Sequence, residues 1–468
     1  MTIGSMTQGR GAAVRRGGIG ALVLVLALAA MQACATDGLL DVDDIDVANP
    51  TSVQTKAALP LLLNGALGDV QGGFSGFGGD ALVTGSGEFS DELQFVETFP
   101  TRQEFDQRDV KLANPINTTI FRNLLRGWAA AVRAQEAYAR LDPAIAGRAM
   151  AYNLEAFSII LLAESYCSGV PFSRLTESGA TLYGEPLTRD AMLSWAVATT
   201  DSALTILAAL PAADTVAANR RHFASILKAR ALLNQGKPAE AATAVAAVPT
   251  GFVLQFQHSA NTARQNNGVF GLTFLDPRMS VSNAEGANGL AYRGDNDPRI
   301  PQRRGTGTGG EPSVGFDGSS PMYLQLKYTS RAANATAASG IEARLIEAEA
   351  RLAAGDATGA LTTLNTLRLA PGSPGSGGVA GLTPLVDAGS ANGRVDQLFK
   401  ERAYWMWLTA HRLGDLRRLV RQYGRQPESI FPTGAYVKGG QYGVDVNLPV
   451  PADELNNPKF TGCLDRGA

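Results

Sequence analysis

Apolar residues recur at helical spacing through most of this chain. Between Thr118 and Leu141 they fall near one face of a helix, at Ile120, Leu124, Trp128, Val132 and Ala139, as in an amphipathic helix packed on a core. The same reasoning predicts helices over residues 144–166, 188–210, 219–235 and 238–248. Asp142 and Pro143 suit the cap and the first position of the helix over 144–166. The chain is therefore predicted to be mainly α-helical.

The segment Lys400–Arg421 combines apolar anchors with many charges. Asp415 lies three residues from both Arg412 and Arg418, the spacing at which helical side chains meet. No Pro interrupts the segment, so it predicts one long helix fixed by apolar and ionic contacts. We expect His411 to form hydrogen bonds on the surface of that helix rather than to act as a catalyst. The predicted apolar anchors are Trp405, Leu408 and Leu416.

Two segments far apart share one pattern. Residues 231–241 (ALLNQGKPAEA) and 350–360 (ARLAAGDATGA) each place Ala five residues before and five residues after a glycine, Gly236 or Gly355. Small residues let two antiparallel helices approach closely, and Gly supplies the left-handed turn between them. The pattern is similar to the second half of a tetratricopeptide unit, whose helical hairpins stack into a superhelix.

Two stretches do not follow the helical pattern. Residues 71–80 (QGGFSGFGGD) are predicted not to form a regular helix, and they lack the consecutive Gly-Lys-Ser/Thr of a phosphate-binding loop. Phe74 and Phe77 within them either pack onto the core, which we favour, or present rings at a binding site. Residues 250–338 form a long irregular insert whose aromatic residues favour an ordered, functional subdomain. These aromatics are Phe252, Phe256, Phe270, Phe274, Tyr292, Tyr323 and Tyr328.

The first 33 residues read as a targeting segment. Arg10, Arg15 and Arg16 precede an apolar run from Ile19 to Ala30, which is shorter than the ~20 residues that span a bilayer. The following Cys34 resembles the lipidated cysteine of a bacterial lipoprotein, the alternative being a secretory signal cut nearby. Residues 34–49 carry several Asp residues and are predicted to be a solvated tether rather than a calcium loop.

Charge and cysteine content narrow the function further. With 41 basic and 43 acidic residues the net charge is −2, which excludes binding of the whole chain to nucleic acid. Cys167 and Cys463 either form one disulfide or remain two buried thiols. The three histidines (His222, His258 and His411) are far apart in the sequence. No metal site and no cofactor are therefore predicted.

Several motifs in order resemble the SusD/RagB family. The segment KERAYWMWLTAHRLGDLRR is similar to its C-terminal signature, although Trp405-Met406 and Thr409-Ala410 depart from the usual residues. LPVPADELNNPKF (448–460) resembles its closing proline segment, and ESYCSGVPF (164–172) its turn before a proline. The signature residues, to which we assign a structural role, are Glu401, Arg402, His411, Arg412, Asp415, Leu416, Arg417 and Arg418.

The resemblance implies a SusD-like fold over residues 50–468. Tetratricopeptide-like hairpins at about 118–248 and 340–425 would form a superhelical scaffold, and the insert at about 250–338 an irregular ligand-binding portion. The implied function is that of a non-catalytic nutrient-uptake lipoprotein, anchored through Cys34 to the cell-surface side of the outer membrane. Such a protein captures oligosaccharide or peptide and acts as a lid on a TonB-dependent, SusC-like β-barrel transporter. Aromatic stacking and hydrogen bonds would hold the ligand.

Two other functions are compatible with parts of the sequence. One is a helical-repeat lipoprotein that scaffolds envelope assembly, which would not need an aromatic insert. The other is a glycosidase using two acids among Glu88, Asp91, Glu92 and Glu97, although clustered acids in a loop are expected to be solvated. For ligand binding we expect at least one of seven residues to be exposed in a cleft. They are Phe74, Phe77, Asp91, Phe99, Tyr292, Tyr323 and Tyr328.

Overall fold

Helices form most of the regular structure in the computed structural model, which describes residues 55–468 except 78–79, 177–178, 212 and 371–381. The targeting segment, Cys34 and the tether lie outside the described residues. The longer helices of the first part are α2 (Leu59–Ser75), α5 (Pro115–Leu141), α6 (Ala146–Ser165), α7 (Arg189–Ala208), α8 (Thr215–Asn234) and α9 (Pro238–Val245). Those of the second part are α11 (Gly340–Ala353), α12 (Ala357–Leu369), α13 (Ala391–Trp405) and α14 (Arg412–Tyr423).

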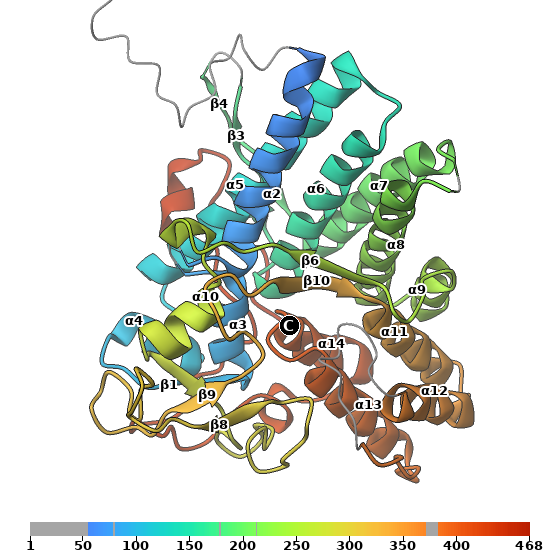
Figure 1. The fold of residues 1–468 in the computed structure, drawn as a ribbon. Helices are drawn as coiled ribbons and strands as arrows, with labels where there is room; N and C mark the ends of the chain where they lie inside the picture. Colours follow the sequence, from blue (N-terminus) through green and yellow to red (C-terminus); the bar gives the residue numbers. More distant parts are fainter. Residues whose placement is uncertain (1–54, 78–79, 177–178, 212, 371–381) are drawn as a thin grey trace, which may run out of the picture. The chain divides into compact units, whose positions relative to one another are not determined.

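Helices that follow one another in sequence pack side by side (Figure 1). Each successive pair from α5 to α9 is in contact, and α11 contacts both α9 and α12. The hairpins α8–α9 and α11–α12 turn at Gly236 and Gly355, whose φ angles of 73° and 83° are left-handed. The prediction of a mainly α architecture built on helical hairpins is confirmed.

Polar residues at the helix starts explain where these helices begin. Asn114, Thr188, Asp214 and Ser339 each accept a hydrogen bond from a backbone N–H of the first turn of α5, α7, α8 and α11 respectively. Each cap satisfies donors that a helix start otherwise leaves unpaired. Asp142 does not cap α6 as predicted. It ends α5, because Pro143 holds the residue before it in an extended conformation, and α6 begins at Ala146.

The expectation that residues 71–80 avoid regular helix is wrong for its first half, since α2 continues to Ser75. The reason is close packing against α5. A Cβ on Gly73 would lie 3.0 Å from the backbone of Asn123, so a small residue is needed there even inside the helix. The cost of glycine in a helix is offset by that approach.

The expected single helix over Lys400–Arg421 is also wrong. α13 ends at Trp405 and α14 begins at Arg412, because Leu408 and Ala410 adopt φ angles of 53° and 60°. Leu408 is nevertheless buried, as predicted, and its backbone groups are paired elsewhere: its N–H donates to Glu92 at 2.8 Å and its carbonyl accepts from the Tyr328 hydroxyl at 3.0 Å. Residues distant in sequence thus replace the helical bonds that the break removes.

The irregular half is made of short strand pairs and short helices. Its β6 (Val253–Phe256) and β10 (Ala335–Ser339) pair antiparallel and bring the two ends of the insert together. Within it lie α10 (Gly268–Phe270) and a single π-helical turn, Gly271–Leu275. The other strand pairs are β1 (Leu93–Phe95) with β7 (Met279–Val281), β8 (Gln302–Arg304) with β9 (Tyr323–Gln325), β2 (Val170–Pro171) with β5 (Pro186–Leu187), and β3 (Arg174–Leu175) with β4 (Thr181–Leu182). Before the insert, α3 (Leu82–Ser90) and α4 (Pro100–Asp106) flank β1.

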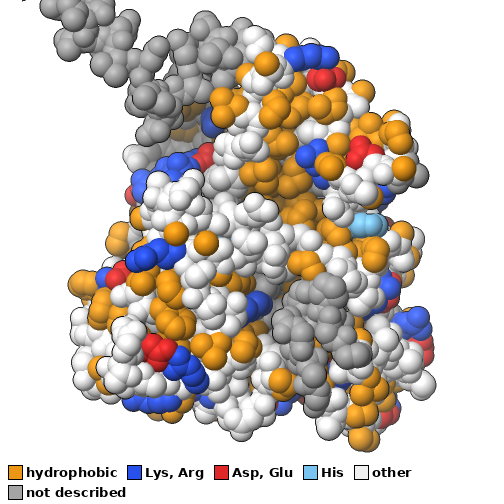
Figure 2. All heavy atoms as spheres, in the orientation of Figure 1, with side chains coloured by type: hydrophobic (Ala, Val, Ile, Leu, Met, Phe, Trp, Pro, Cys, Tyr) orange, Lys and Arg blue, Asp and Glu red, His pale blue; other side chains and the backbone are white. Residues whose placement is uncertain are grey.

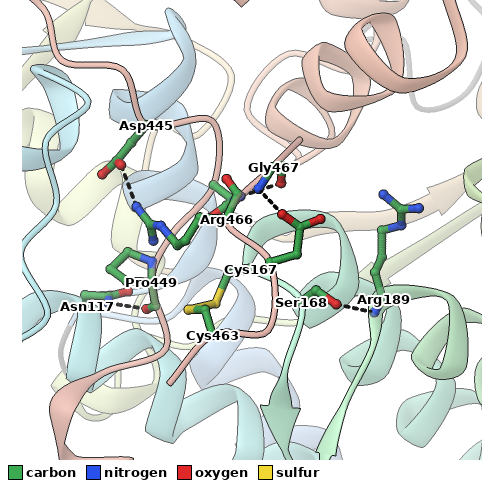
Figure 3. Close-up of a disulfide and its surroundings, with 11 residues drawn as sticks. Asn117, Cys167, Ser168, Arg189, Asp445, Pro449, Cys463, Arg466 and Gly467 are labelled. Atoms are coloured by element: carbon green, nitrogen blue, oxygen red, sulfur yellow. Dashed lines mark hydrogen bonds and ion pairs between the residues drawn. A yellow bond between two sulfur atoms is a disulfide. The ribbon is translucent and has the colours of Figure 1, made fainter. Parts of the chain in front are cut away.

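A disulfide joins Cys167, just after α6, to Cys463 near the C-terminus (Figure 3). The sequence left this pairing open; the two Cα atoms are 6.0 Å apart and 296 residues apart in the chain. Backbone hydrogen bonds between Ser168 and Asp465 hold the same two segments together. The C-terminal segment is therefore fixed onto the helical part by a covalent bond and by backbone pairing.

Charged side chains form small, scattered groups on the surface that Figure 2 shows. On this face Lys and Arg are interspersed with Asp and Glu, while hydrophobic side chains gather over the upper helices. Such a face offers no extended field of one sign.

Candidate functional site

A cleft of about 530 Å³ opens in the irregular half. Three segments line it: Gln94 of β1, residues 283–293 after β7, and residues 433–442 near the C-terminus. A volume of this size falls within the ~300–1,000 Å³ typical of small-molecule sites. The cleft is therefore assembled from chain segments that are hundreds of residues apart.

The two loops of the cleft touch at Gly286. Its φ is 54°, and a Cβ there would lie 2.3 Å from the Thr433 carbonyl oxygen. Next to it, Ala287 donates its N–H to that same oxygen at 3.0 Å, and the Asn288 side chain donates to the Phe431 carbonyl at 3.2 Å. The shape of the cleft is thus fixed by backbone contacts that only glycine permits at position 286.

A buried carboxyl group lines the cleft. Glu285 is 6% exposed, and neither of its oxygens has a hydrogen-bond partner in the structure. Burial raises the pKa of Glu285 well above its ordinary value, as does the nearby charge of Asp106, and the Ser282 hydroxyl offsets this only in part. The Ser282 hydroxyl lies near Glu285 but does not form a hydrogen bond with it. A buried polar group without a partner is costly, so Glu285 is available to a ligand that brings its own donors.

Behind Glu285 lies a set of buried acids and tyrosines. Asp106 accepts a hydrogen bond from the Tyr436 hydroxyl at 2.7 Å, and the Tyr436 ring packs edge-on against Tyr442 with centroids 5.2 Å apart. Burial raises the pKa of Asp106 to about 7, and burial together with Asp106 raises that of Glu88. Asp106 therefore titrates near neutral pH, and burial favours the protonated form of Glu88 as well.

The positive charge in the cleft comes from Arg293. Its guanidinium lies 3.9 Å from the centre of the Tyr323 ring, and Arg304 contacts the same ring at 5.7 Å. Burial lowers the pKa of Arg293, and Tyr323 offsets this in part. An arginine side chain keeps its charge in proteins. The cleft thus combines the cation of Arg293, a buried carboxyl whose pKa is raised and the ring of Tyr442, which together can recognise hydroxyl groups.

The C-terminal signature holds the cleft loop in place. Arg412 forms a bidentate ion pair with Asp91, at 2.8 and 2.9 Å, and Asp91 also accepts the N–H of Leu290 at 2.9 Å. Leu290 belongs to the loop that carries Glu285 and Arg293. Arg412 therefore acts on the cleft through Asp91, without contacting it.

The rest of the signature forms a buried ionic network. Asp415 pairs with Arg418, one of the two partners that its spacing suggested, and with Arg402 of α13. Burial alone would raise the pKa of Asp415, but Arg402 and Arg418 lower it below its ordinary range. His411 is not on the surface as expected: it is 4% exposed, with Nε2 3.3 Å from Glu342. The remaining pairs are Glu401 with Arg299 and Arg368, Arg418 with Glu349, and Arg417 with the carbonyls of Ala163 and Glu164.

Solved structures with a similar architecture belong to SusD-like proteins. A SusD superfamily protein from Parabacteroides distasonis has a TM-score of 0.62 and 14% identity, over 87% of this chain and 98% of that one. A SusD-like carbohydrate-binding protein from Bacteroides fragilis has a TM-score of 0.62 and 14% identity, over 87% and 99%. A SusD/RagB family protein from Bacteroides thetaiotaomicron has a TM-score of 0.59 and 18% identity, over 84% and 94%. The chain has the SusD-like fold. Neither the protein-family models nor the curated proteins give a match.

Four of the seven residues nominated as ligand contacts are buried in this SusD-like fold. Phe74, Asp91, Tyr292 and Tyr328 are each at most 2% exposed. Phe74 packs edge-on against Phe157 and Phe256, and Tyr292 stacks on Tyr404. Their internal contacts explain why they are not available to a ligand.

The other three reach or approach the surface. Phe77 is half-buried and packs on the core, and Tyr323 is half-buried beside Arg293 at the cleft. Phe99 is 56% exposed, and Arg278 lies 5.5 Å from the centre of its ring. Phe99 does not line the cleft itself. None of the seven residues lines the cleft. Tyr323 is linked to it through Arg293, so it remains our candidate from the sequence.

The clustered acids are also not solvated as expected. Glu88, Asp91, Glu92 and Glu97 are each at most 2% exposed, because three of them have specific partners. Glu97 pairs with Arg102 and Arg278, Asp91 with Arg412, and Glu92 with the N–H of Leu408. Among the described residues no group of acids, His or Cys is arranged to hold a metal ion.

Reasoning from the sequence missed Glu285, Arg293 and Tyr442. All three lie in stretches rich in Gly, Ala and Asn. In such stretches charged and aromatic residues are normally predicted to lie in solvent-exposed loops. A usable signal was present in NAEGANG (283–289), since two glycines so close together indicate a sharply turned loop. Sequence spacing could not show that residues 433–442 would cover it.

Proposed function

We propose that this chain is a non-catalytic binding protein that captures oligosaccharide in the cleft lined by Glu285, Arg293 and Tyr442. The observation that supports it most is this polar cleft, set in the irregular half of a SusD-like fold. Arg293 supplies donors to sugar oxygens, while Glu285 and the Gln94 amide accept from or donate to hydroxyls. Tyr442 offers apolar surface to the ring face of the sugar, and Tyr323 packs against the guanidinium of Arg293.

The proposal includes a partner and a location. The chain would be lipidated at Cys34, anchored in the outer membrane and facing the cell surface. There it would act as the lid of a TonB-dependent, SusC-like β-barrel transporter, and it needs no cofactor. The Cys167–Cys463 disulfide supports an exported protein, because such bonds persist in oxidising compartments. Peptide is the other ligand class that this function accommodates.

Binding to an immobilised panel of neutral oligosaccharides, followed by calorimetry with the best of them, tests the capture function. Arg293→Ala and Glu285→Gln should each weaken binding about tenfold or more, the cost of one good polar contact. Arg394→Ala is the matched control, because Arg394 is paired with Asp387 on the surface of α13, away from the cleft. If the protein binds peptides and no oligosaccharide, its function is peptide capture. Equal binding by all variants would show that the cleft is not the site.

A further inference from the structure

We propose a second saccharide-binding site, in a pocket on the helical side of the molecule. The pocket has a volume of about 330 Å³ and lies between α5, α6, α7 and the β2–β5 segment. Its lining includes Trp128, Glu155, Phe172, Arg174 and Trp195. None of its lining residues belongs to the cleft, so this inference does not depend on the proposed function.

The floor of the pocket is an aromatic cluster. Trp128, Phe172 and Trp195 contact one another edge to face, with ring centroids 5.0, 5.8 and 5.0 Å apart. Trp128 and Phe172 are 4% and 7% exposed, whereas Trp195 is half-buried and offers part of its ring to solvent. Because the helices α5 and α7 hold both tryptophans, the exposed ring surface is rigid. A fixed indole face suits the C–H face of a pyranose ring.

Two polar groups at the floor are poorly satisfied by the protein. The indole N–H of Trp128 is buried and has no hydrogen-bond partner. Glu155 is 5% exposed, and its contact with the Trp195 side chain and the charge of Arg174 compensate for only part of the effect of its burial. Arg174, the nearest cation in the lining, is paired instead with Glu136 at 2.9 and 3.1 Å. Leaving such groups without full partners costs stability. A ligand that supplies the missing hydrogen bonds would recover that cost.

The pKa of Glu155 agrees with this arrangement. Burial raises it to about 7, Glu136 adds to the effect, and Arg174 and Trp195 offset it in part. Near neutral pH the carboxyl group can therefore both donate and accept hydrogen bonds. A group of vicinal hydroxyls matches that capacity.

Other ligand chemistries fit less well. An anion would meet Glu155 and Glu185 in the lining, and a purely apolar ligand would leave Glu155 and the Trp128 N–H unsatisfied. A cation would meet the guanidinium of Arg174 in the lining. A neutral polyhydroxylated ring satisfies the aromatic floor, the carboxyl group and the Trp128 N–H together, which is why we assign the pocket to a saccharide unit.

The test is fluorine NMR of the protein labelled with 5-fluorotryptophan. The chain has four tryptophans, and the two outside the pocket are Trp405 and Trp407. Conversion of each tryptophan to Phe assigns the resonances. Titration with a panel of neutral mono- and disaccharides of the gluco, galacto, manno and xylo series should shift the Trp195 and Trp128 signals, and leave those of Trp405 and Trp407 in place.

Variants separate this site from the cleft. Glu155→Gln and Trp195→Ala should each weaken the response about tenfold or more, with Trp128 as the reporter in the second case. Arg293→Ala should leave the response unchanged, so failure of the cleft and failure of the pocket are distinguishable. The inference is overturned if no saccharide of the panel shifts either pocket signal, or if tetramethylammonium shifts them and the sugars do not.

Discussion

The guanidinium of Arg412 and the carboxylate of Asp91 form a bidentate ion pair across 321 residues of sequence. Asp91 is fully buried and Arg412 is 6% exposed. The same carboxylate accepts the N–H of Leu290. One buried acid therefore joins the C-terminal signature, the early segment after α3 and the loop that carries the cleft residues.

Removing either partner of this pair should be strongly destabilising. Arg412→Ala leaves Asp91 buried without its cation, and losses of about 3–5 kcal/mol are typical of such changes. Denaturant unfolding measures the loss. Surface pair Arg394–Asp387 is the control, and Arg394→Ala should leave the unfolding midpoint in place because exposed pairs contribute little. Equal effects at both sites would contradict the role given to Asp91.

Stability should fall as the pH rises from about 4 to about 8. In the folded chain burial raises the pKa of Asp106 from 3.8 to about 7 and that of Glu92 from 4.5 to about 8. Between these values the folded state binds protons that the unfolded state has released, so the free energy of unfolding decreases with pH. Each carboxyl contributes roughly 4–5 kcal/mol to the decrease, at about 1.4 kcal/mol per pKa unit.

The opposite trend holds in acid. Burial would raise the pKa of Glu342, but Arg230 and His411 lower it to about 2, and the stability that this pairing gives is lost as the pH falls from 4.5 through that value. Maximum stability is therefore expected between about pH 4 and 5. Thermal unfolding across pH 3–9 locates the maximum. Asp106→Asn and Glu92→Gln should flatten the alkaline side, and a wild-type maximum near pH 8 would contradict this account.

Reduction of the disulfide should destabilise the protein. Cys167–Cys463 closes a loop that spans 296 residues of sequence, and loss of a native disulfide typically costs about 2–5 kcal/mol. Guanidinium unfolding with and without reductant measures this directly. A Cys167→Ala, Cys463→Ala double variant should match the reduced protein and lose its response to reductant. A variant that still responds would mean that the reductant acts elsewhere.

The break between α13 and α14 gives a prediction of its own. Tyr328→Phe removes the hydroxyl that donates to the Leu408 carbonyl at 3.0 Å, and a buried acceptor left without its donor costs about 1–3 kcal/mol. Tyr183→Phe, on a side chain that is 38% exposed, is the matched control. No difference in unfolding midpoint between the two variants would show that the hydroxyl of Tyr328 does not fix the break.

Local patterns in the sequence predicted the helices well, and long-range contacts explain the errors. The helix over 118–141 and the turns at Gly236 and Gly355 depend on residues close in sequence, and the structure has them. The break at Leu408 depends on Glu92 and Tyr328, which lie far away in the chain. No periodicity within Lys400–Arg421 could reveal those partners.

The candidate site was harder to predict for the same reason. Charges such as Asp91 were read as loop acids because their cations, here Arg412, come from the other end of the chain. The cleft residues Glu285 and Arg293 lie in a segment without helical or strand periodicity. The cleft forms only because the loop over 433–442 packs against that segment. The predicted ligand contacts were mainly aromatic residues, and several of these are buried in the core instead.

The central claim is that this chain serves as the binding lid of an uptake transporter. It is tested most directly by mild detergent extraction of native membranes, affinity capture of the full-length protein and mass spectrometry of what accompanies it. We predict a TonB-dependent β-barrel transporter in stoichiometric amount. Recovery of envelope assembly machinery with no such transporter would contradict the claim and support the scaffold function instead.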